Sequence, residues 1–145
     1  MPTDEAEQIA RLFAQEVPEI AAGIVEIKAI ARKPGVRSKL ALQSRSPHVD
    51  ALGACVGVRG CRIHRIVDQL GKERIDLILW DDSPKELIVK ALQPAGIEKV
   101  ILHPAQHRAT VIVREDQLSL AVGRGDVNRE LASRLCGWEI EVVAE

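Results

Sequence analysis

The chain has few aromatic side chains. It contains no tyrosine, and aromatic residues make up 2% of its 145 residues, namely Phe13, Trp80 and Trp138. This scarcity argues against binding modules that stack nucleobases on a platform of aromatic rings. A ligand-binding surface in this chain is therefore expected to use backbone groups, aliphatic side chains and charged side chains.

The chain also lacks an excess of charge of one sign. Twenty lysines and arginines nearly balance 21 aspartates and glutamates, which leaves a net charge of −1. The charges are unevenly distributed, however, because Arg59, Arg62 and Arg65 lie close together while many acidic residues lie elsewhere, at 4–7 and 81–82. We therefore expect a local basic surface around the three arginines, which is what decides binding to a polyanion.

Long hydrophobic runs and paired cysteines are missing as well. No apolar segment is long enough to cross a membrane, and no signal peptide is apparent. Three cysteines are an odd number, which is typical of a reduced protein. We expect a cytoplasmic monomer that makes no contact with membranes.

A short glycine-rich loop occurs twice, as Gly57-Val58-Arg59-Gly60 and as Gly123-Arg124-Gly125-Asp126. Each copy lies between two segments with helical apolar spacing. Such a loop presents backbone N–H groups at a helix N-terminus, and a phosphate can approach because glycine has no Cβ. We interpret both copies as phosphate-binding loops.

The hydrophobic pattern predicts the same order of elements in both halves. A helix opens each half, at 4–16 and again at the capping box Ser83-Pro84-Lys85-Glu86. Two strands, two helices around the loop and a closing strand follow. We expect them at 24–31, 37–44, 50–56, 61–70 and 74–80, and then at 97–103, 108–113, 117–122, 127–135 and 138–143. The chain should thus form two domains, 1–82 and 83–145, packed rigidly together because no flexible linker separates them.

This order of elements around a Gly-x-x-Gly loop is that of the prokaryotic, or type II, KH domain. Several segments also resemble the tandem KH region of the NusA family of bacterial transcription termination and antitermination factors. They are residues 12–20 (LFAQEVPEI), 25–27 (VEI), 37–39 (RSK), 53–57 (GACVG), 75–77 (IDL) and 135–138 (LCGW). The resemblance covers nearly the whole chain, and this combination is more specific than a lone Gly-x-x-Gly.

The resemblance implies an α+β fold of two tandem type II KH domains, each a three-stranded sheet covered by helices. It further implies binding of single-stranded RNA in the regulation of transcription elongation, pausing, termination and antitermination. RNA polymerase and other transcription elongation factors are the partners expected in this family. The domains that precede the KH pair in the bacterial family are missing from the sequence, so we expect either a fragment or a short stand-alone homologue.

A KH groove holds about four nucleotides, with phosphates on the glycine loop and bases bonded to a neighbouring strand. We predict that the strand edges are 39–43 and 110–113. The predicted RNA-binding residues are Lys39, Gly57, Val58, Arg59, Gly60, Arg62, Arg65, Gly123, Arg124 and Gly125. Arg62 and Arg65 could alternatively belong to an ordinary solvated helix face.

In the family that the chain resembles, the second loop is similar to Gly-Arg-Gly-Gly. The second loop of this chain departs from that pattern, because Asp126 replaces the last glycine. We expect this aspartate to cap the following helix by accepting hydrogen bonds from its first N–H groups. It would then occupy the donors that a phosphate needs and would repel the phosphate. The second domain is accordingly expected to bind RNA more weakly than the first.

Two other functions remain open from the sequence alone. The chain could be a protein-interaction scaffold in which the second domain no longer binds RNA. It could also be an enzyme that uses Cys55 or Cys61 with His64, although no third orienting group is evident. These three residues lack Cys-x-x-Cys spacing and a fourth ligand, so we expect no metal and no cofactor. We favour RNA binding without enzymatic activity, and we expect Trp138 to be a packing residue and His103 and His107 to be surface residues.

Overall fold

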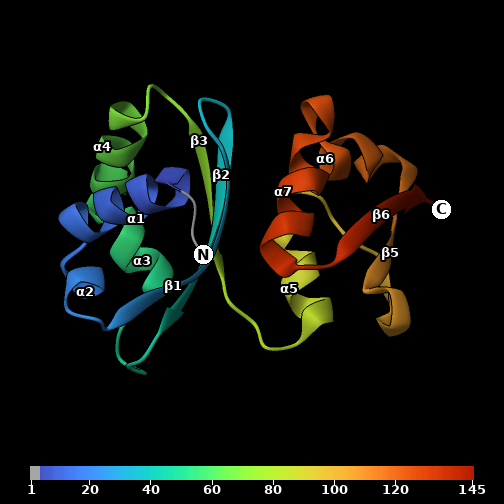
Figure 1. The fold of residues 1–145 in the computed structure, drawn as a ribbon, viewed down its shortest axis with the longest axis horizontal. Coiled ribbons are helices and arrows are strands. Elements are labelled where there is room, and N and C mark those ends of the chain that lie inside the picture. Colours follow the sequence, from blue (N-terminus) through green and yellow to red (C-terminus); the bar gives the residue numbers. More distant parts are fainter. Residues whose placement is uncertain (1–3) are drawn as a thin grey trace. The chain divides into compact units, whose positions relative to one another are not determined.

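The computed structural model describes residues 4–145, which divide into two compact units between Trp80 and Asp81. Each unit contains one three-stranded sheet together with helices that lie against it (Figure 1). The predicted α+β class is therefore confirmed.

The first unit follows the element order expected from its sequence, with one short helix at Pro18–Ala21 that was not predicted. Its elements are α1 (Asp4–Glu16), α2 (Pro18–Ala21), β1 (Val25–Lys33), β2 (Arg37–Ser44), α3 (Ala51–Val56), the short 3-10 turn η1 (Val58–Gly60), α4 (Cys61–Gln69) and β3 (Arg74–Leu79). Figure 1 shows the four helices on one side of the sheet. The glycine loop thus joins α3 to α4, as predicted.

The core of the first unit forms between α1 and the sheet. Ile9, Phe13 and Val17 follow one another at four-residue spacing, and all three are fully buried. They belong to one cluster with Leu40 and Leu42 of β2. Burial of each such side chain contributes about 1.5–3 kcal/mol, so this stripe fixes α1 on the sheet.

The sheet of the first unit has the order β1-β2-β3, with β1 antiparallel and β3 parallel to β2. Within this sheet, Leu40 pairs with Ile30 on one side and with Leu77 on the other. Both edges of β2 are therefore hydrogen-bonded, and the prediction that 39–43 offers a strand edge is wrong. An edge of the sheet belongs to β3, against which α3 also lies.

The second unit repeats this topology. Its elements are α5 (Pro84–Ala91), β4 (Lys99–His103), η2 (Pro104–Gln106), β5 (Arg108–Val113), η3 (Glu115–Gln117), α6 (Leu118–Val122), η4 (Arg124–Asp126), α7 (Val127–Cys136) and β6 (Glu139–Ala144). The hydroxyl of Ser83 accepts a hydrogen bond from the Glu86 N–H, so α5 begins at the predicted cap. The sheet order is β4-β5-β6. Because β5 is central, the strand edge predicted at 110–113 is also wrong, and β6 takes the place of β3.

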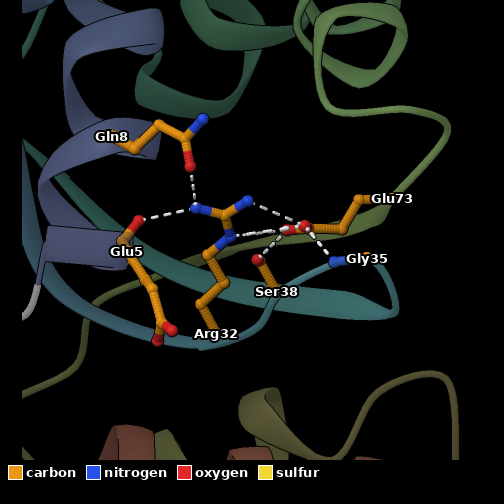
Figure 2. Close-up of polar contacts among 6 residues, drawn as sticks. All are labelled: Glu5, Gln8, Arg32, Gly35, Ser38 and Glu73. Atoms are coloured by element: carbon orange, nitrogen blue, oxygen red, sulfur yellow. Dashed lines mark hydrogen bonds and ion pairs between the residues drawn. The ribbon is translucent and has the colours of Figure 1, made fainter.

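A buried ion pair closes the end of the first unit where the β1–β2 turn meets the start of β3 (Figure 2). The guanidinium of Arg32 donates to the Glu73 carboxylate at 3.0 and 3.1 Å, and both side chains are buried. Arg32 also donates to the Glu5 carbonyl and the Gln8 amide oxygen, each at 2.7 Å. Glu73 accepts further hydrogen bonds from Ser38 Oγ and the Gly35 N–H. One pair of charges thus connects α1, the turn and β3.

Candidate nucleic-acid interface

The two glycine loops have nearly the same backbone. The first glycine of each has dihedral angles that only glycine adopts readily, with φ 79° and ψ 174° at Gly57 and φ 79° and ψ 166° at Gly123. A Cβ on Gly57 would lie 2.8 Å from Cγ of Arg62, and one on Gly123 would lie 2.8 Å from the backbone N of Asn128. Both glycines are therefore required by backbone conformation and by space.

The last two positions of each loop are left-handed but have more room. Arg59 and Gly60 have φ values of 55° and 75°, and their counterparts Gly125 and Asp126 have values of 63° and 66°. A Cβ on Gly125 would have nothing within 4 Å. Aspartate tolerates the left-handed region better than most residues, which explains how Asp126 replaces the glycine with no change of backbone.

Each loop carries one exposed arginine. Arg59 lies at the third position of the first loop and Arg124 at the second position of the second loop. Within residues 4–145, neither guanidinium has an ion-pair partner. Val58 is 80% exposed beside Arg59. Both loops thus present an uncompensated positive charge to solvent.

In each loop, the side chain five residues after the first glycine donates hydrogen bonds to carbonyl groups of the helix that precedes the loop. Arg62 Nη1 donates to the Ala54 carbonyl at 2.6 Å and to Oε1 of Glu19 at 3.0 Å. Asn128, at the corresponding position, donates through Nδ2 to the carbonyls of Leu92, Leu120 and Ala121. Both residues therefore bind the carbonyl end of the helix that precedes the loop.

Asp126 is placed differently from the sequence-based prediction. Its backbone occupies the N-cap position of α7, yet among the described residues 4–145 its carboxylate makes no capping hydrogen bond. Instead, the carboxylate accepts hydrogen bonds from Nε and Nη2 of Arg129 at 2.8 and 2.6 Å. The predicted cap is wrong for two reasons. The backbone of Asp126 is left-handed (φ 66°, ψ 13°) and not extended as in an ordinary capping residue, and an arginine three residues along the chain offers a charged, two-point partner.

The surface beside each loop is hollowed. In the second unit, a pocket of about 400 Å³ is lined by Leu118, Ser119, Val122, Gly123 and Arg124. In the first unit, Val56 of α3 and Leu79 of the edge strand β3 are large apolar side chains that remain 37% and 40% exposed. A pocket of about 610 Å³, larger in volume than that of the second unit, is lined by Gly57, Val58 and Glu19 of α2 among other residues. Apolar side chains therefore adjoin each loop, with Val56 and Val58 at the first and Leu118 and Val122 at the second. Glu19 and Asp50 add two carboxylates to the pocket at the first loop.

Comparison with known proteins agrees with this duplicated arrangement. Residues 3–80 match the family described as the NusA-like first KH domain, and residues 84–145 match the NusA-like second KH domain. The chain belongs to the NusA family. Its fold of two tandem prokaryotic-type KH domains, expected from the sequence, is thereby confirmed, and the KH domains of this family are not enzymes.

Relatives and a solved structure extend the match over most of the chain. The transcription termination/antitermination protein NusA of Thermus thermophilus is 52% identical over 132 residues, and that of Halalkalibacterium halodurans is 43% identical over 137 residues. These alignments cover 91% and 94% of the chain but 34% and 36% of the relatives, so the chain spans about a third of their length. The crystal structure of APE1850 has the same fold, with a TM-score of 0.69 at 20% identity, and the match covers 99% of this chain and 100% of that one.

The structure of the first KH domain corrects the predicted role of Lys39. The lysine side chain is fully buried, and its Nζ lies 2.8 Å from Oδ2 of Asp76, to which Arg37 also donates. Burial lowers the pKa of Lys39, and the Asp76 carboxylate offsets only part of this effect. The ammonium group of Lys39 is thus occupied by Asp76, and we do not assign it to the RNA interface.

The buried thiol of Cys55 in the first KH domain does not have the properties of a nucleophile. Burial raises the pKa of the Cys55 thiol to about 12, so this thiol is protonated at neutral pH. The described residues 4–145 contain no group of three or more His, Cys, Asp or Glu side chains that could hold a metal ion.

Within residues 4–145, every helix is too short or too polar to span a bilayer.

Proposed function

We propose that the chain binds single-stranded RNA through the glycine loops of both KH domains and acts in the control of transcription elongation, pausing, termination and antitermination. The observation that carries this proposal is the duplicated loop. The two copies share one backbone conformation, and each presents an arginine that has no ion-pair partner among residues 4–145. The NusA relatives are transcription termination/antitermination proteins, which supports the role in termination and antitermination.

The loops supply the chemistry for the phosphate backbone. A KH loop clamps about four nucleotides through their backbone, and the N–H groups of its glycines can approach phosphate oxygens closely. Arg59 and Arg124 add a positive charge beside these donors. The proposed phosphate contacts are Gly57, Val58, Arg59, Gly60, Gly123, Arg124 and Gly125.

The bases would then lie over the apolar surface next to each loop. In the first KH domain this surface includes Val56 and Leu79, and the unpaired edge of β3 offers backbone donors and acceptors for base edges. In the second KH domain Leu118 and Val122 line the pocket, and β6 is the edge strand. This arrangement needs no aromatic platform, in keeping with the composition.

The two helix arginines of the first KH domain have different roles in this proposal. Arg65 is 64% exposed and forms an ion pair with Glu16 at 3.5 Å, so we assign it only long-range attraction for RNA from an accessible, partly compensated charge. Arg62 is held by the Ala54 carbonyl and by Glu19 and therefore supports the loop. RNA polymerase and other elongation factors are proposed partners of the monomeric chain.

Replacement of Val58 and Arg59 by aspartate tests the proposal. Both side chains are exposed, so the fold should survive, but two carboxylates would face the phosphates. We expect V58D/R59D to reduce the affinity for a ten-nucleotide single-stranded RNA at least 30-fold in fluorescence anisotropy, with an unchanged melting temperature. R59D and R11D form a matched pair, because each replaces an exposed arginine of the first KH domain. Equal affinities for R59D, R11D and the parent would refute the proposal.

A further inference from the structure

We infer that Arg129 is a positioning residue that keeps the second glycine loop open to phosphate by holding the Asp126 carboxylate away from the backbone donors of the loop. This inference rests on the proposed RNA-binding function. It assigns a role to a side chain that the sequence pattern did not single out, and it reverses the expected effect of Asp126.

Arg129 is itself fixed by three residues of the second KH domain. Two of its nitrogens bind the Asp126 carboxylate in a two-point contact, and Nη1 donates to the Ile140 carbonyl in β6 at 3.0 Å. Nη1 also lies 3.5 Å from Oε1 of Glu139. The guanidinium therefore has a defined orientation, because it contacts both Asp126 and β6.

The alternative position of Asp126 would be harmful to phosphate binding. An aspartate at the N-cap ordinarily accepts hydrogen bonds from the N–H groups of the second and third helical residues. Those are the groups that would face a phosphate at the start of α7. The left-handed backbone of Asp126 and its two-point contact with Arg129 together direct the carboxylate away from these donors, which stay unoccupied by a capping carboxylate.

The charge of the second loop also depends on Arg129. Arg129 offsets the carboxylates of Asp126 and Glu139, and Arg124 adds a positive charge that has no ion-pair partner within residues 4–145. Hydrogen bonds from Arg129 lower the pKa of Asp126, so the carboxylate stays ionised near neutral pH. Its negative charge is consequently balanced by the guanidinium and not by a proton.

Substitutions at the two positions in the full chain test this inference. R129Q should weaken binding of a ten-nucleotide RNA about three- to ten-fold and should flatten the dependence of affinity on salt, because fewer phosphates are neutralised. D126G/R129Q removes the unpaired carboxylate and should restore the parent affinity within twofold. D126G alone should also bind within twofold of the parent, because Arg129 already neutralises the aspartate.

R134Q is the matched control, since it removes an exposed arginine from the last turn of the same helix. It should bind RNA like the parent. R129K retains the charge but loses the two-point geometry, so its affinity should lie between those of the parent and R129Q. Melting curves show whether each variant is folded. If R129Q does not fold, the other two variants still test the inference. An affinity of R129K equal to that of the parent, or a higher affinity of D126G than of the parent, would overturn it.

Three outcomes with folded variants would also overturn it. The affinity of R129Q could equal that of the parent, D126G/R129Q could bind as weakly as R129Q, or D126G could bind more than threefold tighter than the parent. The second outcome would mean that Arg129 acts only by anchoring β6. Failure of RNA binding itself is distinguishable, because it would appear as equal affinities for V58D/R59D and the parent.

Discussion

Glu73 of the first KH domain and Trp138 of the second occupy the same position, one residue before the third strand of each sheet. In both domains the next N–H donates to a carbonyl of the hairpin turn, from Arg74 to Val36 at 3.3 Å and from Glu139 to His107 at 3.0 Å. Yet Glu73 binds Arg32, whereas Trp138 stacks on His107 with ring centroids 4.2 Å apart. At the residue before the third strand, the first KH domain thus has an ion pair and the second KH domain has a pair of stacked rings.

The ion pair predicts a large loss of stability when one charge is removed. E73Q leaves the buried Arg32 without its counter-charge, which typically costs about 3–5 kcal/mol. We expect this decrease in the free energy of unfolding in urea denaturation at pH 7. E7Q, which changes an exposed glutamate of α1, should remain within about 0.5 kcal/mol of the parent.

The same pair predicts a dependence on pH. Burial tends to raise the pKa of Glu73, but the hydrogen bonds from Arg32, Ser38 and Gly35 outweigh it and lower the pKa below its usual value. The folded pKa is thus depressed relative to the unfolded chain. The contribution to stability is present above the unfolded value of about 4.3 and is lost as the pH falls through the folded pKa. The stability gap between parent and E73Q should shrink below pH 4, and a gap that stays constant would contradict this role.

The two glycines of the second loop predict a contrast between neighbouring positions. G123A places a Cβ 2.8 Å from backbone and side-chain atoms of Asn128 at a φ of 79°, and it should destabilise the chain by about 3 kcal/mol. G125A adds a Cβ in open space at a left-handed position, where the cost is about 1 kcal/mol. Equal losses in thermal or urea unfolding would show that the space around Asn128 is not limiting.

RNA binding should separate the same two variants. The first loop carries Arg59 at the position that corresponds to Gly125, so a side chain at that point is compatible with the loop. We expect G125A to bind a ten-nucleotide RNA within twofold of the parent. G123A should weaken binding, measured below its melting temperature, because the altered first residue shifts the N–H groups of the loop.

Much of the fold could be predicted because its signals are local. The apolar spacing of Ile9 and Phe13, the cap at Ser83 and the repeated glycines each act within a few residues of the chain. The order of strands could not be predicted, because pairing on both sides of β2 depends on contacts between distant segments. For the same reason the Lys39–Asp76 and Arg32–Glu73 pairs, 37 and 41 residues apart, left no pattern in the sequence.

The candidate site was predictable to a different extent. The loops and their exposed arginines followed from the repeated motif. Arg62 was predicted to bind RNA, with a solvated helix face as the alternative, and its guanidinium is instead bound to the Ala54 carbonyl and to Glu19. The pairing of Asp126 with Arg129 did have a local signal, since opposite charges three residues apart on a helix attract each other. The cap preference of aspartate concealed that signal, because both interactions compete for the same carboxylate.

Use of both KH domains on one RNA strand predicts a dependence of affinity on oligonucleotide length. The residues between β3 and α5 are Trp80, Asp81, Asp82 and Ser83, so the connection is short and the second binding event should have a high effective concentration. At about four nucleotides per domain, a ten-nucleotide RNA should bind at least 100-fold tighter than a four-nucleotide RNA, and increasing salt should reduce this advantage. A duplex of equal length should compete poorly.

R124D should lower the affinity for the longer RNA and leave the affinity for the shorter RNA nearly unchanged, since the first loop suffices for four nucleotides. Equal affinities of the parent for the two lengths would mean that one domain binds RNA alone.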